Sequence, residues 1–146
     1  MVSTRFGRDK VTASPRALRV LWVLLLAAAC RPDPASPRGT AERFLDAYYV
    51  QIDLRAALPL TSGLARQKVE QSIALTQGQP IDATTRKPTV RYRLLEERPD
   101  GETAIHFVYL GRITVEGADD FERRWLVTVR RETDGWRVTN YQEPDG

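Results

Sequence analysis

The chain contains a single histidine, His106, and histidine is the side chain best suited to act as a general base near neutral pH. His106 alternates with Ile105 and Phe107, so in an extended strand it faces away from the apolar side, together with Arg91 and Arg93. We therefore interpret it as a surface or interface residue. Because the chain has no other histidine to activate a hydroxyl, we expect no nucleophile triad.

The remaining composition excludes several other kinds of site. One histidine and one cysteine leave no metal-ligand cluster of recognisable spacing, and no glycine-rich turn leads from a strand into a helix to hold phosphate. The formal charge is +3, but residues 1–29 carry five basic residues and one acidic residue, which leaves −1 for the rest. The part expected to fold is nearly neutral, so we predict no metal, no cofactor and no nucleic-acid partner.

An acid beside a tyrosine would provide a different chemistry, that of an isomerase or hydratase. Asp46 falls on the polar side of the first predicted helix, and Glu96 is in phase with the inner face of its strand but lies at the strand's end. The inner face thus lacks a carboxylate, and we predict no catalytic residue. An enzyme would need Asp46 or Asp53 turned into the cavity beside Tyr92 or Tyr109.

The only cysteine, Cys30, lies at the junction of an apolar run and a proline-rich run. Basic residues ending at Arg19 precede the apolar stretch Val20–Ala29, which is the order of a secretory signal. That stretch is about half the roughly 20 residues needed to span a bilayer. The prolines of residues 31–39 favour an extended tether.

The sequence AAAC, which ends at Cys30, resembles the cleavage and lipidation motif of bacterial lipoproteins, although Ala27 occupies the aliphatic position. This resemblance implies a signal peptide at 1–29, and a lipidated (palmitate-bearing) cysteine with its tether at 30–39. It also implies a membrane-anchored protein of the cell envelope, in the outer membrane where one exists, because Arg31 follows the cysteine. The alternative is an ordinary secretory signal with an unpaired thiol.

Two periodicities divide the remaining chain. Apolar residues recur at helical spacing from Thr40, the expected N-cap, to Ile52, then around Leu54 to Leu58, and again from Gly63 to Thr76. From Arg86 onward the alternation is that of strands, in four runs separated by three turn-forming segments. Helices followed by an antiparallel meander predict an α+β domain in which the N-terminal helices cover one face of a sheet of about four strands.

The stretches AERFLDAYYVQID and RRWLVTVRRETDGWRVTNYQ resemble the opening helix and closing strands of the nuclear transport factor 2-like (SnoaL/cystatin-like cone) superfamily. The resemblance covers about residues 40–143 and implies a cone with a curved sheet. This superfamily includes enzymes as well as binding modules, so the fold alone assigns no activity.

These patterns define two candidate surfaces. The candidate ligand cavity, in the cone, consists of Tyr48, Tyr49, Tyr92, Phe107, Tyr109 and Trp125. The candidate interface, on the outer sheet face, consists of Leu95, His106, Val108, Leu110, Leu126 and Tyr141. We expect a non-catalytic envelope module that binds a small apolar ligand, or pairs with a second copy or another envelope protein. The alternative is a lipid-anchored isomerase or hydratase that uses a cavity tyrosine and an acid.

Overall fold

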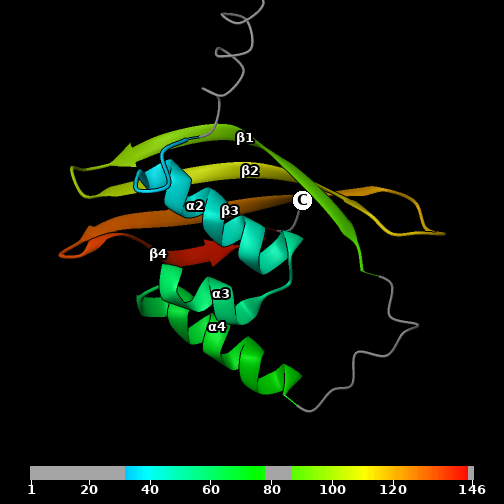
Figure 1. Cartoon of the computed structure of the whole chain (residues 1–146). Helices are drawn as coiled ribbons and strands as arrows, with labels where there is room; N and C mark the ends of the chain where they lie inside the picture. Colours follow the sequence, from blue (N-terminus) through cyan, green and yellow to red (C-terminus); the bar gives the residue numbers. More distant parts are fainter. Residues whose placement is uncertain (1–31, 78–86, 145–146) are drawn as a thin grey trace, which may run out of the picture. The chain divides into compact units, whose positions relative to one another are not determined.

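The structure, a computed structural model, describes residues 32–77 and 87–144; the predicted signal peptide and Cys30 lie outside them. From Pro32 onward the chain forms one compact unit. Helical segments come first, and four strands follow (Figure 1).

The first helix, α2, spans Pro37–Leu45 and continues as a π-helical segment, η1, at Asp46–Val50. It begins earlier than predicted, and its N-cap is Ser36 rather than Thr40. The Ser36 hydroxyl accepts a hydrogen bond from the Gly39 amide at 2.9 Å, and Pro37 occupies the first turn. Thr40 is buried inside the helix, and its hydroxyl donates to the Ser36 carbonyl. The last part of the proposed tether is therefore helical.

The remaining helical segments agree with the sequence pattern. A short helix, α3, spans Leu54–Ala57 and runs into a 3₁₀ turn, η2, at Leu58–Leu60, which contains Pro59. The longest helix within the described residues, α4, spans Gly63–Thr76, the range expected from its apolar spacing.

The four strands form one antiparallel sheet in the order β1-β2-β3-β4, as predicted. They are β1 (Thr89–Asp100), β2 (Ala104–Thr114), β3 (Phe121–Glu132) and β4 (Gly135–Gln142). α2 crosses one face of the sheet, and α4 lies beside β4 (Figure 1). The core lies between these layers, where Phe44 and Leu45 of α2 and Val69 of α4 belong to one buried cluster with the inward side chains of β2 to β4.

Two bulges reverse the faces of side chains near strand ends, because one extra residue shifts the two-residue alternation. In β4 the extra residue is Thr139, so Tyr141 pairs with Val127 on the inner face. Tyr141 is 8% exposed, and the centre of its ring lies 5.0 Å from the centre of the Phe44 ring. Its predicted place in the outer interface is wrong.

In β1 the extra residue is Leu95. Beyond it Glu96 pairs with Val108, on the outer face, and Glu97 pairs with Phe107, on the inner face. The inner phase assigned to Glu96 is therefore wrong, and Glu97 is the sheet carboxylate that shares a face with the aromatic core.

All members of the buried cluster lie between Ala41 and Tyr141, so the unit from Pro32 to Gly146 carries its own core. We predict that this segment, produced alone, unfolds in one cooperative thermal transition in reducing buffer. Circular dichroism with and without a chelator tests this. A lower melting temperature or a broader transition in the presence of the chelator would contradict this prediction.

Candidate functional site

A stack of aromatic rings closes one part of the inner sheet face. The Trp125 indole of β3 lies flat across Gly111 of β2, so close that a Cβ atom on Gly111 would overlap the ring. The Tyr49 ring stacks on the other side of Trp125, with centroids 4.2 Å apart and planes 15° from parallel. Glycine at 111 is thus required by the packing of the tryptophan and the tyrosine.

An open cleft of about 320 Å³ adjoins this stack, and its walls are mainly apolar. Phe121, which is 43% exposed, lies against it, and the Arg123 guanidinium is 5.7 Å from the centre of the Phe121 ring. We call this the aromatic cleft; its lining residues are Tyr48, Tyr49, Ile52, Pro88, Val90, Ile113, Phe121, Arg123, Trp125 and Glu143.

The Tyr49 hydroxyl is the buried polar group of the aromatic cleft. Its oxygen makes no hydrogen bond of good geometry within the described residues, although the Glu143 carboxylate lies close enough to attract its proton. Burial, and then the neighbouring Glu143 carboxylate, raise the pKa of Tyr49 well above its usual value, so the hydroxyl keeps its proton at neutral pH. A buried donor without a well-aligned acceptor is unfavourable, and a bound molecule with an acceptor atom would satisfy it.

Three of the six predicted cavity residues line the aromatic cleft: Tyr48, Tyr49 and Trp125. Of the other three, Tyr92 lines a separate hollow together with Arg91 and Arg93, and Phe107 and Tyr109 are fully buried in the core. The remaining lining residues were missed. Val90, Ile113, Phe121 and Arg123 had a signal, since all four are in phase with the inner face, but nothing in the sequence pointed to Glu143.

An acid of η1, Asp46, contacts a tyrosine of β1, Tyr92. The sequence placed Asp46 on the polar side of its helix and did not indicate this contact. The Tyr92 hydroxyl donates to Asp46 Oδ1 at 2.8 Å. Burial, and then this carboxylate, raise the pKa of Tyr92, so it is a proton-bearing donor. Asp46 thus lies beside Tyr92, as an enzyme would require. It is exposed, however, and lines none of the clefts described here, so it is not turned into a cavity.

The neighbouring Tyr109 hydroxyl is buried without a hydrogen-bond partner in the described chain. Burial raises the pKa of Tyr109, and the Glu42 carboxylate raises it further. Glu42 itself is paired with Arg38, whose Nε lies 2.7 Å from Oε1.

His106 lies on the outer sheet face, as its phase indicated, but it does contact a hydroxyl. Its Nδ1 is 3.0 Å from Thr128 Oγ1, and its Nε2 is 3.3 Å from Asp100 Oδ2. The sequence did not indicate this contact between the histidine and a hydroxyl. Thr128 is the direct cross-strand neighbour of His106, and neither residue lines a described cleft, so we read the contact as sheet pairing.

The predicted interface residues other than Tyr141 do share the outer face. Val108 and Leu126 are cross-strand partners, and Leu110 is half-buried one step along β2. Leu95 is 40% exposed at the β1 bulge. Their role as an interface stays a prediction.

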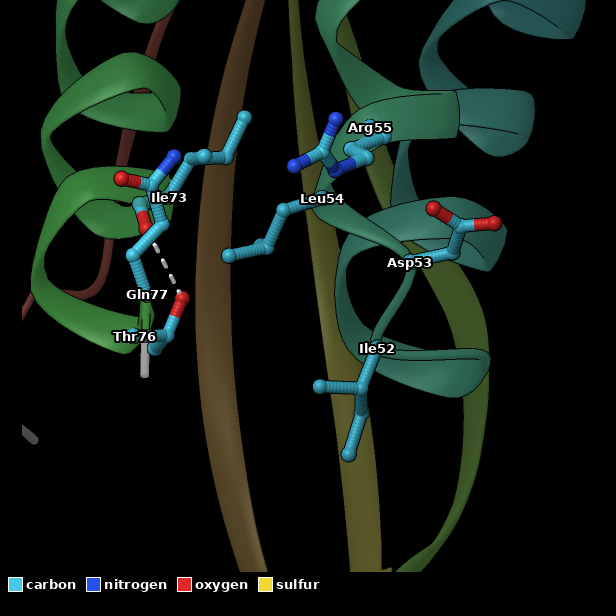
Figure 2. Close-up of a pocket in the computed structure, with 7 residues that line it drawn as sticks. All are labelled: Ile52, Asp53, Leu54, Arg55, Ile73, Thr76 and Gln77. Atoms are coloured by element: carbon cyan, nitrogen blue, oxygen red, sulfur yellow. Dashed lines mark hydrogen bonds between the residues drawn. The ribbon is translucent and has the colours of Figure 1, made fainter. Parts of the chain in front are cut away.

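A second open cleft, of about 430 Å³, lies between α3 and the end of α4 and was not predicted (Figure 2). Figure 2 shows Leu54 extending from α3 towards the side of α4. Two of the polar groups here are paired locally: Asp53 accepts from the Ala56 amide, and the Thr76 hydroxyl donates to the Ser72 and Ile73 carbonyls. The side chains of Arg55 and Gln77 are exposed to water, and no buried polar group without a hydrogen bond lines this cleft, so we place the candidate site in the aromatic cleft.

Three of the solved structures that resemble this one define the fold. An NTF-2 like protein of unknown function from Shewanella oneidensis MR-1 has 13% identity and a TM-score of 0.56, over 73% of this chain and 94% of that chain. A ketosteroid isomerase-like protein from Erwinia carotovora atroseptica has 10% identity and a TM-score of 0.50, over 77% and 96%. A computationally designed 17-OHP binder has 14% identity and a TM-score of 0.50, over 79% and 95%.

The chain has the nuclear transport factor 2-like fold. This scaffold occurs in enzymes and in proteins that are not enzymes. No protein-family model matches the sequence, and no curated protein matches it. Among residues 32–77 and 87–144, no cluster of three or more potential metal ligands occurs, and no helix is long and apolar enough to cross a membrane.

The contact between Trp125 and Gly111 gives a stability prediction. Gly111→Ala should lower the free energy of unfolding by about 1–3 kcal/mol, because the added methyl group overlaps the indole and overpacks the core. Thermal or denaturant unfolding measures this loss. In a Trp125→Leu background the same change should cost much less; an equal loss in both backgrounds would show that the ring is not the cause.

Proposed function

We propose that the protein is a non-catalytic, lipid-anchored envelope module that binds a small, planar, mainly apolar molecule in the aromatic cleft. The observation that carries the proposal is the buried Tyr49 hydroxyl, which makes no hydrogen bond of good geometry, in a cleft whose other walls are chiefly aromatic and aliphatic. Small-molecule sites typically combine apolar walls with a few polar groups that fix orientation. The expected ligand therefore carries one acceptor atom on a flat apolar body.

The known use of this fold supports such a role. A designed protein with the same fold binds 17-OHP, so the scaffold accommodates a small ligand. In this chain the Tyr49 and Trp125 rings stack, and Phe121 remains 43% exposed beside them. A flat ligand would cover the exposed Phe121 ring and remove it from water.

The acid–tyrosine pair of Asp46 and Tyr92 favours a second candidate, an isomerase or hydratase. In such an enzyme Asp46 would take a proton from the substrate as the general base, and Tyr92 would turn its single hydroxyl proton from Asp46 to the developing oxyanion. We rank this function second because the described clefts that could hold a substrate do not include Asp46.

The lipid anchor is proposed from the sequence around Cys30, which lies outside the described residues. An apolar run and three alanines precede this cysteine, and it has no possible intramolecular disulfide partner. Acylation of its thiol would hold the domain at the cell envelope.

We predict that Cys30→Ala abolishes acylation and leaves the protein unprocessed or released from the membrane. Metabolic labelling with a palmitate analogue and detergent-phase partitioning measure the two effects. Normal processing of the variant with recovery in the detergent phase would end the lipoprotein proposal.

Tyr49→Phe tests the ligand site. The isolated domain should bind both 2-naphthol and naphthalene, and the variant should bind 2-naphthol about fivefold more weakly because one hydrogen bond is lost. Its affinity for naphthalene should not change. Removal of the buried hydroxyl should also raise the free energy of unfolding by up to about 1 kcal/mol. Tryptophan fluorescence follows binding.

Phe121→Ser is the matched variant for the apolar wall, since it removes exposed ring area and should weaken binding of both probes. The proposal fails if neither probe binds the wild-type domain. It also fails if Tyr49→Phe changes the affinity for the two probes equally.

A further inference from the structure

Four arginines gather on the outer face of the sheet, opposite the face that holds the core. Arg91 pairs across the strands with Arg112, and Arg93 and Arg124 pair with Leu110 from its two sides. Two adjoining hollows of about 210 and 670 Å³ lie over this region and share Arg93, Leu110 and Glu122. We call this region, Arg91, Arg93, Arg112 and Arg124 around Leu110, the arginine face.

In the part of the chain that the structure describes, the four arginines of the arginine face lack close acidic partners, as do Arg43, Arg55 and Arg130, but only on this face do such arginines lie together. Four arginines elsewhere form ion pairs at 3.0 Å or less with acids at 42, 70, 96 and 134. Within the described residues, Arg91, Arg93 and Arg124 make no side-chain hydrogen bond or ion pair, and Arg112 approaches Asp120 only at 3.9 Å.

The arginine face is unfavourable for the isolated domain. Like charges directly opposite each other in a sheet repel, and Arg91 and Arg112 are such a pair. The acids nearby are Glu122, which lines both hollows and is the cross-strand partner of Arg112 in β3, and Asp120, so the four arginines outnumber the acids two to one. A bound anion would remove this repulsion, and guanidinium groups match the oxygens of a phosphate in geometry.

We propose that the arginine face docks on a membrane surface that contains anionic phospholipid. Its shape favours a planar array of phosphates over an acidic peptide, because the arginines spread across three strands, a width of about 10 Å. An extended peptide would instead pair along one strand edge. Leu110 at the centre and Leu95, 40% exposed beside it, add the apolar area that interfacial binding uses together with cations.

This inference rests in part on the proposed anchor at Cys30. Pro37, where α2 begins, follows Cys30 by seven residues, which span at most about 25 Å when extended. Attraction between exposed charges fades over a Debye length of about 8 Å at physiological salt. A short tether keeps the domain close enough for the arginine face to meet the headgroups.

The experiment uses the domain from Pro32 to Gly146, which carries its own core and lacks the anchor. Cosedimentation with vesicles of phosphatidylcholine and phosphatidylglycerol, at a ratio of about three to one, is compared with phosphatidylcholine alone. We expect binding to the mixed vesicles only, with loss of binding at high salt. Arg91→Glu with Arg93→Glu should weaken it at least about tenfold, since each basic residue contributes strongly near an anionic surface.

Arg43→Glu with Arg55→Glu is the matched control, because it changes the net charge equally at exposed positions of α2 and α3. It should retain most of the vesicle binding. The Arg91→Glu change places an acid opposite Arg112, so the Arg91→Glu, Arg93→Glu variant should have a melting temperature no lower than that of the wild type. Its affinity for 2-naphthol should also be unchanged, which separates this test from that of the aromatic cleft.

Equal binding to both kinds of vesicle, or an equal loss in the control variant, would overturn the proposal. Binding to a polyglutamate peptide without binding to vesicles would also overturn it, in favour of an acidic protein partner. Because the tested domain lacks Cys30, its vesicle binding reports on the arginine face alone, and the Cys30→Ala experiment reports on the anchor alone.

Discussion

The packing of Trp125 over Gly111 is the constraint on which the inner face depends. A large indole fits flat against a sheet only where the neighbouring strand has no side chain, and Gly111 provides that space. Tyr49 then stacks on the indole and brings η1 against the sheet. The same contact that holds the helix in place forms the back of the aromatic cleft, so the stability and the proposed binding role share one set of rings.

The bulges in β1 and β4 divide the chemistry between the two faces. The β4 bulge brings Tyr141 inward onto Phe44, which extends the aromatic core. The β1 bulge turns Glu96 outward and Glu97 inward. Each bulge inserts a single residue, yet it moves every following side chain of that strand to the opposite face. The two bulges therefore decide which face Tyr141, Glu96 and Glu97 occupy.

The two proposed surfaces lie on opposite sides of one sheet and have opposite character. On the inner side, apolar rings surround one buried hydroxyl, and burial keeps that hydroxyl protonated. On the outer side, exposed arginines surround Leu110. A sheet separates such environments well because successive side chains point to opposite faces. The one residue common to the aromatic cleft and the outer hollows is Arg123, so a ligand in the cleft and an anionic surface on the outer face would otherwise use different residues.

The sequence alone determined the order of helices and strands, the α+β class and the meander, because apolar periodicity reflects which side of each element meets the core. It also predicted that Tyr48, Tyr49 and Trp125 share a cavity. It could not locate the bulges at Leu95 and Thr139, since the alternation of residue types carries no mark of an unpaired position. Only the tertiary structure placed Asp46 against Tyr92 and left the Tyr49 hydroxyl without a hydrogen bond of good geometry, because such contacts join segments far apart in the chain and depend on how the helices settle on the curved sheet.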